Sequence, residues 1–162
     1  MKFLNYLWAT WFGSGYAPLA PGTAGSLAAL PFVWFFATLG KTELLIFAVF
    51  TFVTGVIVSN YISKDKTADD PQIVVIDEVC GQALAFLLIP ADFLDIFTFK
   101  AWFAALISFG FFRLFDVWKP WPASYFDTKM HNGWGMMLDD VAAGVYAMIA
   151  TYGAIKIYPL IF

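Results

Sequence analysis

The sequence has few of the residues that bind transition metals or form cross-links. It contains one cysteine, Cys80, and one histidine, His131, among 162 residues. A single cysteine excludes an intramolecular disulfide and a CxxC zinc knuckle, and a single histidine excludes a zinc site built from several imidazoles. Cys80 lies inside an apolar run without a basic neighbour, which keeps a thiol protonated, so we interpret it as a structural residue and not a nucleophile.

Charged residues are scarce as well. They make up 13% of the chain and apolar residues make up 61%, whereas an ordinary soluble domain is about 25% charged and about 45–50% apolar. This composition and the mean hydropathy of +0.75 predict an integral membrane protein. The net charge of −3 excludes nucleic acid as a partner, because binding of its phosphates requires clustered Lys and Arg. The N-terminal stretch MKFLNYLWATWFGSGYAP lacks a small-residue cleavage site, so we expect it to be retained.

Apolar residues gather in five segments, at 26–40, 44–62, 79–89, 101–112 and 141–155. A helix needs about 20 residues to cross the hydrocarbon core of a bilayer. The second segment is long enough, and the last is long enough when 138–158 is counted. The third and fourth reach this length only with their charged ends included. The first is short and interrupted by Pro31.

Helices are favoured over strands, because backbone groups exposed to lipid must hydrogen-bond within their own segment. We therefore predict an all-α fold, a compact multi-helix bundle embedded in the membrane. No repeat or linker interrupts the chain, which predicts a single domain over residues 1–162. A stripe of small residues in the last segment predicts close helix packing: Ala143, Ala147, Ala150 and Ala154.

The charge distribution predicts which face of the bundle lies in the cytoplasm. When the chain is threaded through a membrane, most basic residues fall on the side of the N-terminus: Lys2, Lys64, Lys66, Arg113, Lys119 and Lys129. Only Lys41, Lys100 and Lys156 lie opposite. The positive-inside rule then makes the N-terminal side cytoplasmic. Acidic residues at three helix ends fall on this same side: Asp77, Glu78, Asp116, Asp139 and Asp140. We expect them to form one site at the cytoplasmic face.

These carboxylates indicate a metal site. Carboxylates that converge near a low-dielectric surface repel one another and raise each other's pKa, and a hard divalent cation relieves the repulsion. Mg²⁺ prefers oxygen ligands and is often held by one or two carboxylates plus a substrate phosphate. We therefore predict Mg²⁺ as the cofactor, with all five carboxylates as candidate ligands. A solvated helix start is the alternative for either acidic pair taken alone.

The segment RLFDVWKP adds two cations to the acidic set. Arg113, Asp116 and Lys119 recur every three residues, which places them along one side of a continuing helix before Pro120 ends it. One interpretation is an internal salt bridge. The other is a metal-bound Asp116 flanked by Arg113 and Lys119, which bind phosphate oxygens.

Two further segments contain candidate site residues. The stretch GSGYAPLAPGTAGS precedes an apolar helix, and a glycine-rich approach to a helix N-terminus exposes N–H groups that bind phosphate. Thr23 either binds the phosphate or caps this helix, as Ser26 also can. No Walker lysine follows, so nucleotide binding is not predicted. In HNGWGMMLDD, His131 is either a general acid or an ordinary hydrogen-bonding loop residue.

Four blocks of the chain resemble the phosphatidylglycerophosphatase A family, in the family's order. They are FGSGYAPLAPGTAGSLAALP, IVVIDEVCGQ, FRLFDVWKPWPASYFD and HNGWGMMLDDVAAGV, and together they cover residues 13–146. The family often has Gly-Gly after the histidine, and Asn132 and Gly133 stand here instead. Because Asn also tolerates positive φ, this departure leaves the resemblance intact.

The resemblance implies an all-helical, Mg²⁺-dependent lipid phosphatase. Its substrate would be phosphatidylglycerophosphate, hydrolysed to phosphatidylglycerol and inorganic phosphate by a multi-pass protein of the bacterial inner membrane. Matching motifs imply these site residues: Asp77, Glu78, Asp116, Lys119, Asp139 and Asp140. We expect catalytic roles for Asp116, Asp139, Asp140, Lys119 and His131, and phosphate binding by Arg113, Lys119 and Thr23. The nucleophile is either a water or an Asp carboxylate.

Two other functions compete with a phosphatase. A small cation transporter also places acidic residues in apolar helices, but it needs them deep in the span. A structural membrane subunit needs no such residues at all. The acidic clusters therefore favour an enzyme over both.

Overall fold

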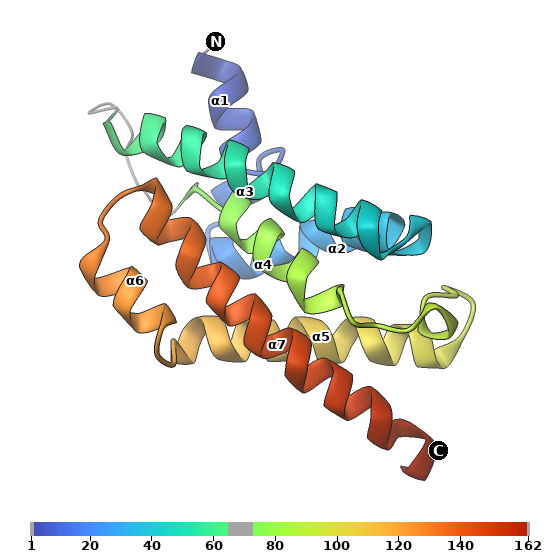
Figure 1. Ribbon diagram of the computed structural model, residues 1–162. Coiled ribbons are helices and arrows are strands. Elements are labelled where there is room, and N and C mark those ends of the chain that lie inside the picture. Colours follow the sequence, from blue (N-terminus) through green and yellow to red (C-terminus); the bar gives the residue numbers. More distant parts are fainter. Residues whose placement is uncertain (1, 65–72, 162) are drawn as a thin grey trace.

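The computed structural model describes residues 2–64 and 73–161 (Figure 1). Every regular element in these two ranges is helical, which confirms the predicted all-α fold. The elements are α1 (Lys2–Ala9), η1 (Ser14–Tyr16), α2 (Pro21–Leu39), α3 (Lys41–Lys64), α4 (Ile76–Phe86), η3 (Ala91–Phe93), α5 (Phe99–Trp118), α6 (Ala123–Lys129) and α7 (Gly133–Ile161). The prediction of the cytoplasmic face counted Lys66 in the loop 63–76. Lys66 and most of that loop lie outside the described residues.

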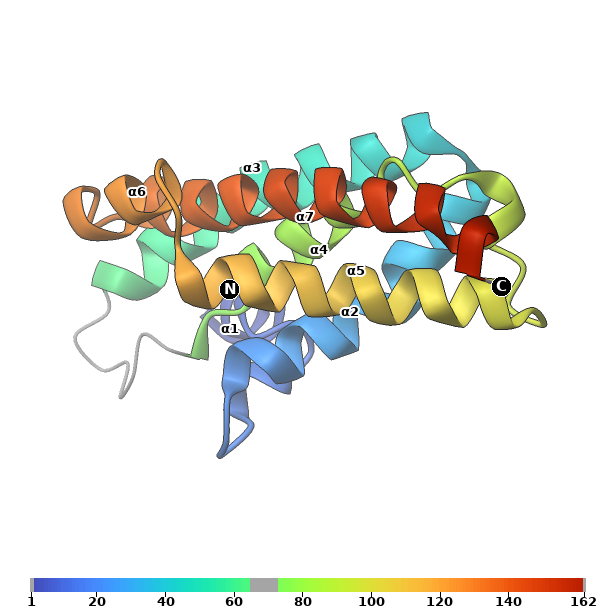
Figure 2. The same ribbon diagram turned by 90° about the horizontal axis from the view of Figure 1, so that it is seen from below.

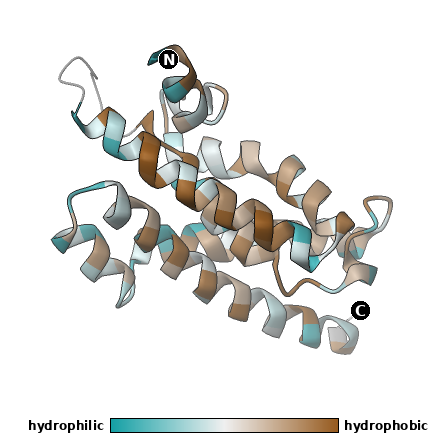
Figure 3. Ribbon diagram, turned by 45° about the horizontal axis from the view of Figure 1, so that its top comes forward, coloured by the Kyte–Doolittle hydropathy of each residue, from teal (hydrophilic) through white to brown (hydrophobic). Residues whose placement is uncertain are grey.

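Four helices are long and apolar enough to cross a membrane: α2, α3, α5 and α7. Apolar residues, brown in Figure 3, cover the long helices, and hydrophilic residues gather toward helix ends and loops. Many large apolar side chains on these four helices are exposed, among them Phe35, Ile46 and Leu106. Such a surface suits lipid and not water. The protein is therefore a helical membrane protein, as its composition predicts.

The helix α2 is longer than the sequence indicates. The prediction that Pro31 interrupts the first segment is wrong, because α2 begins at Pro21 and continues through Pro31 to Leu39. Pro21 occupies the first turn, where a missing N–H breaks no hydrogen bond. Pro31 is exposed on the surface of α2. Membrane helices tolerate an internal proline when local adjustments and neighbouring groups satisfy the freed carbonyl.

The helix α4 is the centre of the bundle. It packs against α2, α3, α5 and α7, and its side chains are almost all buried. With 11 residues it is too short to span a bilayer, and the loop that includes η3 completes the chain's path to the far end. Asp77 and Glu78 begin this helix. A short central helix thus carries two acidic residues to one end of a bundle of longer helices.

The helix ends separate into two groups (Figures 1 and 2). The start of α2, the start of α4, the end of α5 and the start of α7 meet at one end, which we call the acidic end. The turn at Gly40 and the loop around η3 meet at the other, where they line one shallow cavity. The predicted alternation of loops between two faces is therefore present in the described residues.

Two glycines allow α4 and α7 to approach each other closely. A Cβ at Gly144 would lie 2.6 Å from the carbonyl oxygen of Gly81, and a Cβ at Gly81 would overlap the Phe112 ring. Ala143 and Ala147 of the predicted small-residue stripe are fully buried beside this crossing. Because α7 also carries Asp139 and Asp140, this contact sets how far those side chains lie from α4.

We predict that Gly144→Ala destabilises the protein by about 1–3 kcal/mol, because the added methyl group overpacks the contact with the α4 backbone. Gly153→Ala is the matched control on the same helix, since a Cβ there meets nothing within 4 Å. The control is expected to be neutral or stabilising by up to about 1 kcal/mol through helix propensity. Thermal unfolding in detergent measures both, and equal transition temperatures for the two variants would contradict the packing argument.

Candidate active site

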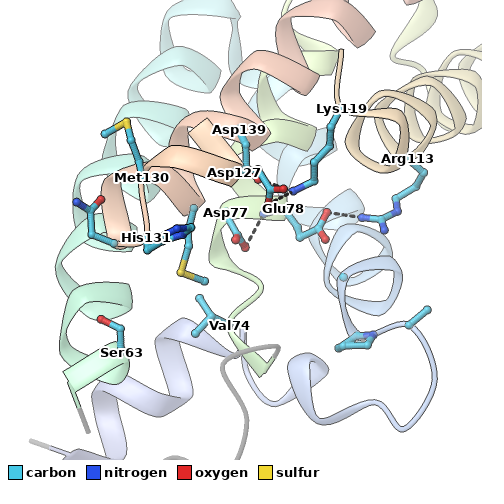
Figure 4. A pocket seen from close by; sticks show the side chains of 15 residues that line it. Ser63, Val74, Asp77, Glu78, Arg113, Lys119, Asp127, Met130, His131 and Asp139 are labelled. Atoms are coloured by element: carbon cyan, nitrogen blue, oxygen red, sulfur yellow. Dashed lines mark hydrogen bonds and ion pairs between the residues drawn. The ribbon is translucent and has the colours of Figure 1, made fainter. Parts of the chain in front are cut away.

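A polar cavity of about 700 Å³ opens at the acidic end (Figure 4). It is bordered by the starts of α2, α4 and α7, the ends of α3 and α5, and α6 with the loop that follows it. Its charged and polar lining side chains are Ser63, Asp77, Glu78, Arg113, Lys119, Asp127, His131, Asn132 and Asp139. Segments far apart in the sequence therefore assemble one site, as expected from the acidic helix ends.

Three carboxylates form the most compact group in the site. Oxygens of Glu78, Asp116 and Asp140 all lie within 4.8 Å of one another. Glu78 and Asp140 are buried and Asp116 is partly buried. They come from α4, α5 and α7, so only the packed bundle brings them together. Three carboxylates at this separation suit a divalent cation that takes oxygen ligands.

Arg113 binds two members of this group. Its guanidinium donates to Glu78 Oε2 at 2.5 Å and pairs with Asp116 Oδ2 at 3.0 Å. The Ser26 hydroxyl donates to the same Glu78 oxygen at 2.9 Å, and the α2 backbone at Gly22 lies so close that a Cβ there would overlap the Glu78 carboxylate. The internal salt bridge considered for Arg113 and Asp116 is therefore present. It is part of a network anchored on Glu78.

Lys119 forms a second pair of contacts on the other side of the cavity. Its Nζ donates to Asp139 Oδ2 at 2.6 Å and to Asp127 Oδ1 at 2.7 Å. The prediction that Lys119 continues the helix face of Arg113 and Asp116 is wrong, because α5 ends at Trp118. Lys119 adopts the left-handed conformation with φ 47°. The following Pro120 disfavours the right-handed helical region at this position, so the side chain turns toward α6 and α7.

The electrostatics of the site outside the membrane-spanning helices follow from burial. Burial and the neighbouring Asp116 raise the pKa of the Glu78 carboxyl to about 7, against the lowering effect of Arg113. Burial and the adjacent Glu78 likewise hold the pKa of Asp77 well above its ordinary value. Burial lowers the pKa of Lys119, but its bonds to Asp127 and Asp139 outweigh this and raise the pKa. Burial and neighbouring like charges thus disfavour the ionised form of the carboxyl groups on the α4 side of the cavity.

The other residues considered from the sequence differ in whether they line the cavity. His131 is exposed and lines the cavity. Thr23 lies within the first turns of α2 and is not among the lining residues, whereas Ser26 joins the Glu78 network. Neither hydroxyl caps α2, because the N-cap position is Ala20. Cys80 is buried and its pKa is raised to about 12 by burial, which agrees with a structural role.

Asp127 is a residue of the site that the sequence pattern did not predict. It lies on α6, a short helix that the hydrophobic pattern does not indicate, and it pairs with Lys119 at 2.7 Å. Pro120 and Pro122 separate the two residues, so no continuous helix could have indicated this pair.

Asn132 also differs from expectation: its Oδ1 accepts from the N–H groups of Trp134 and Gly135 and so caps α7. Asn132 therefore contributes hydrogen bonds at this position. Its tolerance of positive φ is not used, because Asn132 is not among the residues with positive φ.

A membrane-embedded helical bundle with a carboxylate cluster, an arginine and a lysine around one cavity has the features of a membrane enzyme acting on phosphate esters. The chain belongs to the phosphatidylglycerophosphatase A family, whose model matches residues 7–155. The family consists of phosphoric monoester hydrolases, so the chain is an enzyme of this class.

Two curated relatives support this assignment, and a third is named for a different activity. The chain is 38% identical to phosphatidylglycerophosphatase A of Escherichia coli (strain K12), over 86% of this chain and 77% of the relative. It is 37% identical to phosphatidylglycerophosphatase A of Haemophilus influenzae, over 91% and 86%. It is 38% identical to a Bacteroides thetaiotaomicron protein named "Putative phosphatidylinositol-3-phosphatase", over 91% of each chain. No solved structure matches the chain at a significant level.

We predict that Asp127→Asn lowers the rate of phosphate release by about tenfold, because it removes one of the two anions that hold the Lys119 ammonium in place. Lys119→Met is expected to lower it by about 10² or more, because it removes the cation itself. Asp92→Asn is the matched control, since Asp92 pairs with Lys100 at the opposite end of the bundle. Wild-type rates for Asp127→Asn would show that Asp127 plays no part in the site.

Proposed function

We propose that this protein hydrolyses phosphatidylglycerophosphate to phosphatidylglycerol and inorganic phosphate with the help of Mg²⁺, and that residues 1–162 form one helical membrane domain for this purpose. Two relatives are named for this activity. The observation that carries the proposal is the group Glu78, Asp116 and Asp140 beside Arg113, at the end of helices that suit a bilayer. A phospholipid headgroup lies at the level where such helices end.

The carboxylate group fits Mg²⁺ in chemistry and in size. Two oxygens on opposite sides of Mg²⁺ are about 4.2 Å apart, since each Mg–O distance is about 2.1 Å. The 4.8 Å limit of the cluster comes within a small side-chain adjustment of that spacing. Asp77 and Asp139 line the adjoining cavity and complete the proposed ligand set. When bound, the metal polarises the phosphoryl oxygens and activates a water.

The chain's own cations bind and orient the phosphate. Arg113 and Lys119 lie on different sides of the cavity and each already contacts two carboxylates, so both are held in place before a substrate arrives. Their charges offset the negative charge of a phosphomonoester and of the group being transferred. We assign His131 as the general acid at the cavity rim and the first turn of α2 as a further phosphate contact. Thr23 lies in that turn but does not line the cavity, so we assign it no contact of its own.

A cation transporter is the weaker proposal. Transport requires acidic residues spaced along a path through the bilayer. In the described residues the clustered carboxylates lie at one end of the bundle, and the acidic residues of the far end, Glu43, Asp92 and Asp95, are exposed. A phosphatase accounts for the neighbouring arginine and lysine, which a cation path would avoid.

We predict that phosphate release from phosphatidylglycerophosphate requires Mg²⁺ and is lost in excess chelator, because the carboxylates would otherwise repel the substrate. Asp116→Asn and Asp140→Asn are expected to lower activity by at least about 10², and to weaken binding of Mn²⁺ measured by its electron paramagnetic resonance signal. Asp92→Asn is the control for both measurements. Full activity in chelator would overturn the metal assignment.

The same assay identifies the preferred lipid substrate. Because one relative is named for a different phosphomonoester lipid, phosphatidylinositol 3-phosphate is tested beside phosphatidylglycerophosphate. We expect the higher kcat/KM for phosphatidylglycerophosphate. The reverse order would replace the proposed substrate while leaving the enzyme class unchanged.

We also propose that the protein resides in the bacterial inner membrane with its acidic end in the cytoplasm. The basic residues Lys64, Lys119 and Lys129 lie at the acidic end, in accord with the positive-inside rule. Exposed tryptophans occur there too, at Trp118, Trp121 and Trp134. Tryptophan is enriched at membrane interfaces, so these side chains suit the level of the lipid headgroups.

We predict that a cysteine placed in α6 is protected from a membrane-impermeant thiol reagent in intact spheroplasts. The variant is Thr128→Cys in a Cys80→Ser background, and Asp92→Cys at the opposite end is expected to react. Permeabilisation then exposes the first site and serves as the control. Labelling of Thr128→Cys with protection of Asp92→Cys in intact cells would invert the orientation.

A further inference from the structure

We infer that the apolar groove between α2 and α5 holds one acyl chain of the lipid whose phosphate binds at the acidic end. This inference rests on the proposed function, because it assigns a second part of the same substrate. It adds a binding site that is separate from the carboxylate cluster and the polar cavity.

The groove has a volume of about 510 Å³, within the usual range of about 300–1,000 Å³ for small-molecule sites. Leu27, Leu30 and Trp34 of α2 form one wall, and Trp102 and Leu106 of α5 form the other. The loop at Leu94 closes it. The two helices touch only sparsely, and the groove lies between them.

The polar groups of the groove are already satisfied. The Trp34 Nε1–H donates to the carbonyl of Leu94 at 2.8 Å, and the Trp102 Nε1–H donates to the carbonyl of Ile96 at 2.9 Å. The Thr38 hydroxyl donates to the carbonyl of Phe35 at 2.7 Å. No tryptophan N–H remains to bind a polar ligand, so the groove matches a hydrocarbon chain and not a sugar or a headgroup.

The position of the groove matches the length of the substrate. Gly22 and Arg113 border the polar cavity, and Leu30 and Leu106 lie eight and seven residues further along the same helices. At 1.5 Å per residue these steps are about 12 Å and about 10 Å. About ten covalent bonds separate the terminal phosphorus of phosphatidylglycerophosphate from its first acyl oxygen. At about 1.3 Å per bond in an extended chain, they span about 13 Å.

The groove would act by orienting the acyl chain of the substrate. Lipid tails are as apolar as leucine side chains, so moving a chain from the bilayer into the groove gains little from the hydrophobic effect. Close packing against two tryptophans instead fixes the direction of the chain, and thereby the position of the phosphate in the cavity. Misplacing a reacting group by about 1 Å can lower a rate about 10²-fold. Other membrane phospholipids lack the terminal phosphomonoester that binds the acidic end. The position of their acyl chains in the groove is therefore not fixed.

Photo-crosslinking tests this assignment directly. The wild-type protein in nanodiscs with Mg²⁺ receives a non-hydrolysable phosphonate analogue of phosphatidylglycerophosphate with a diazirine in one acyl chain. A phosphatidylcholine with the same chain is the comparison. We expect adducts on peptides of α2 and α5 that line the groove with the first lipid, reduced at least about fivefold with the second. Equal labelling by both lipids would mean an ordinary lipid-facing surface, and labelling elsewhere would also overturn the inference.

A groove-filling variant supplies an independent measurement. Leu106→Trp narrows the groove at an exposed position, and Ile149→Trp on α7 is the matched lipid-facing control outside any cavity described above. We expect Leu106→Trp to lower kcat/KM for the long-chain lipid by about fivefold or more, and to leave the water-soluble deacylated headgroup ester unaffected. The control should change neither.

The outcomes separate the two proposals. Equal losses on both esters, or none on the lipid, would refute the groove while the phosphatase stands. If the wild-type protein hydrolyses neither ester in Mg²⁺, the proposed function fails and the groove assignment fails with it.

Discussion

Negative charge buried at the end of an apolar bundle must be compensated, and the arrangement around Glu78 meets this requirement. An unpaired buried carboxylate is so unfavourable that it would be protonated or drawn to water. Glu78 instead accepts from Arg113 and Ser26, and it shares Arg113 with Asp116. The second turn of α2, the last turns of α5 and the start of α4 are therefore held together by one network of ion pairs and hydrogen bonds.

The short helix α4 makes this network possible. Because it is enclosed by four longer helices, its acidic first turn is surrounded by protein and not by lipid. The glycine contact between α4 and α7 then brings Asp140 within reach of Glu78. A larger residue at either glycine would separate two of the three carboxylates. Helix packing in the middle of the bundle thus controls the geometry of the site at its end.

In the proposed assignment, the two halves of the bundle bind different parts of one lipid. The acidic end offers charged groups suited to a phosphomonoester, and the groove between α2 and α5 offers a hydrocarbon surface without free donors. Both features lie on the same pair of helices. A lipid that spans the membrane interface is the class of substrate for which such a division is useful, because its polar and apolar parts occupy different depths.

Residue composition and local spacing specify the class of protein and the residue types of its site. Composition alone specifies a helical membrane protein, since lipid requires internally satisfied backbone groups. The placement of acidic residues at the ends of apolar segments, together with the family resemblance, identified five of the six carboxylates that line or adjoin the cavity in the described residues. These features can be predicted from the sequence because the hydropathy and residue spacing of one helix do not depend on its neighbours.

The packing of the helices determines which of these groups meet. It selected Glu78, Asp116 and Asp140 as the compact cluster and left Asp139 with Lys119. It added Asp127 from a helix that the sequence pattern does not indicate, turned Lys119 away from the face of α5, and kept α2 continuous through Pro31. Distances between side chains on different helices depend on how closely those helices pack. Residue spacing within one segment therefore cannot predict these distances.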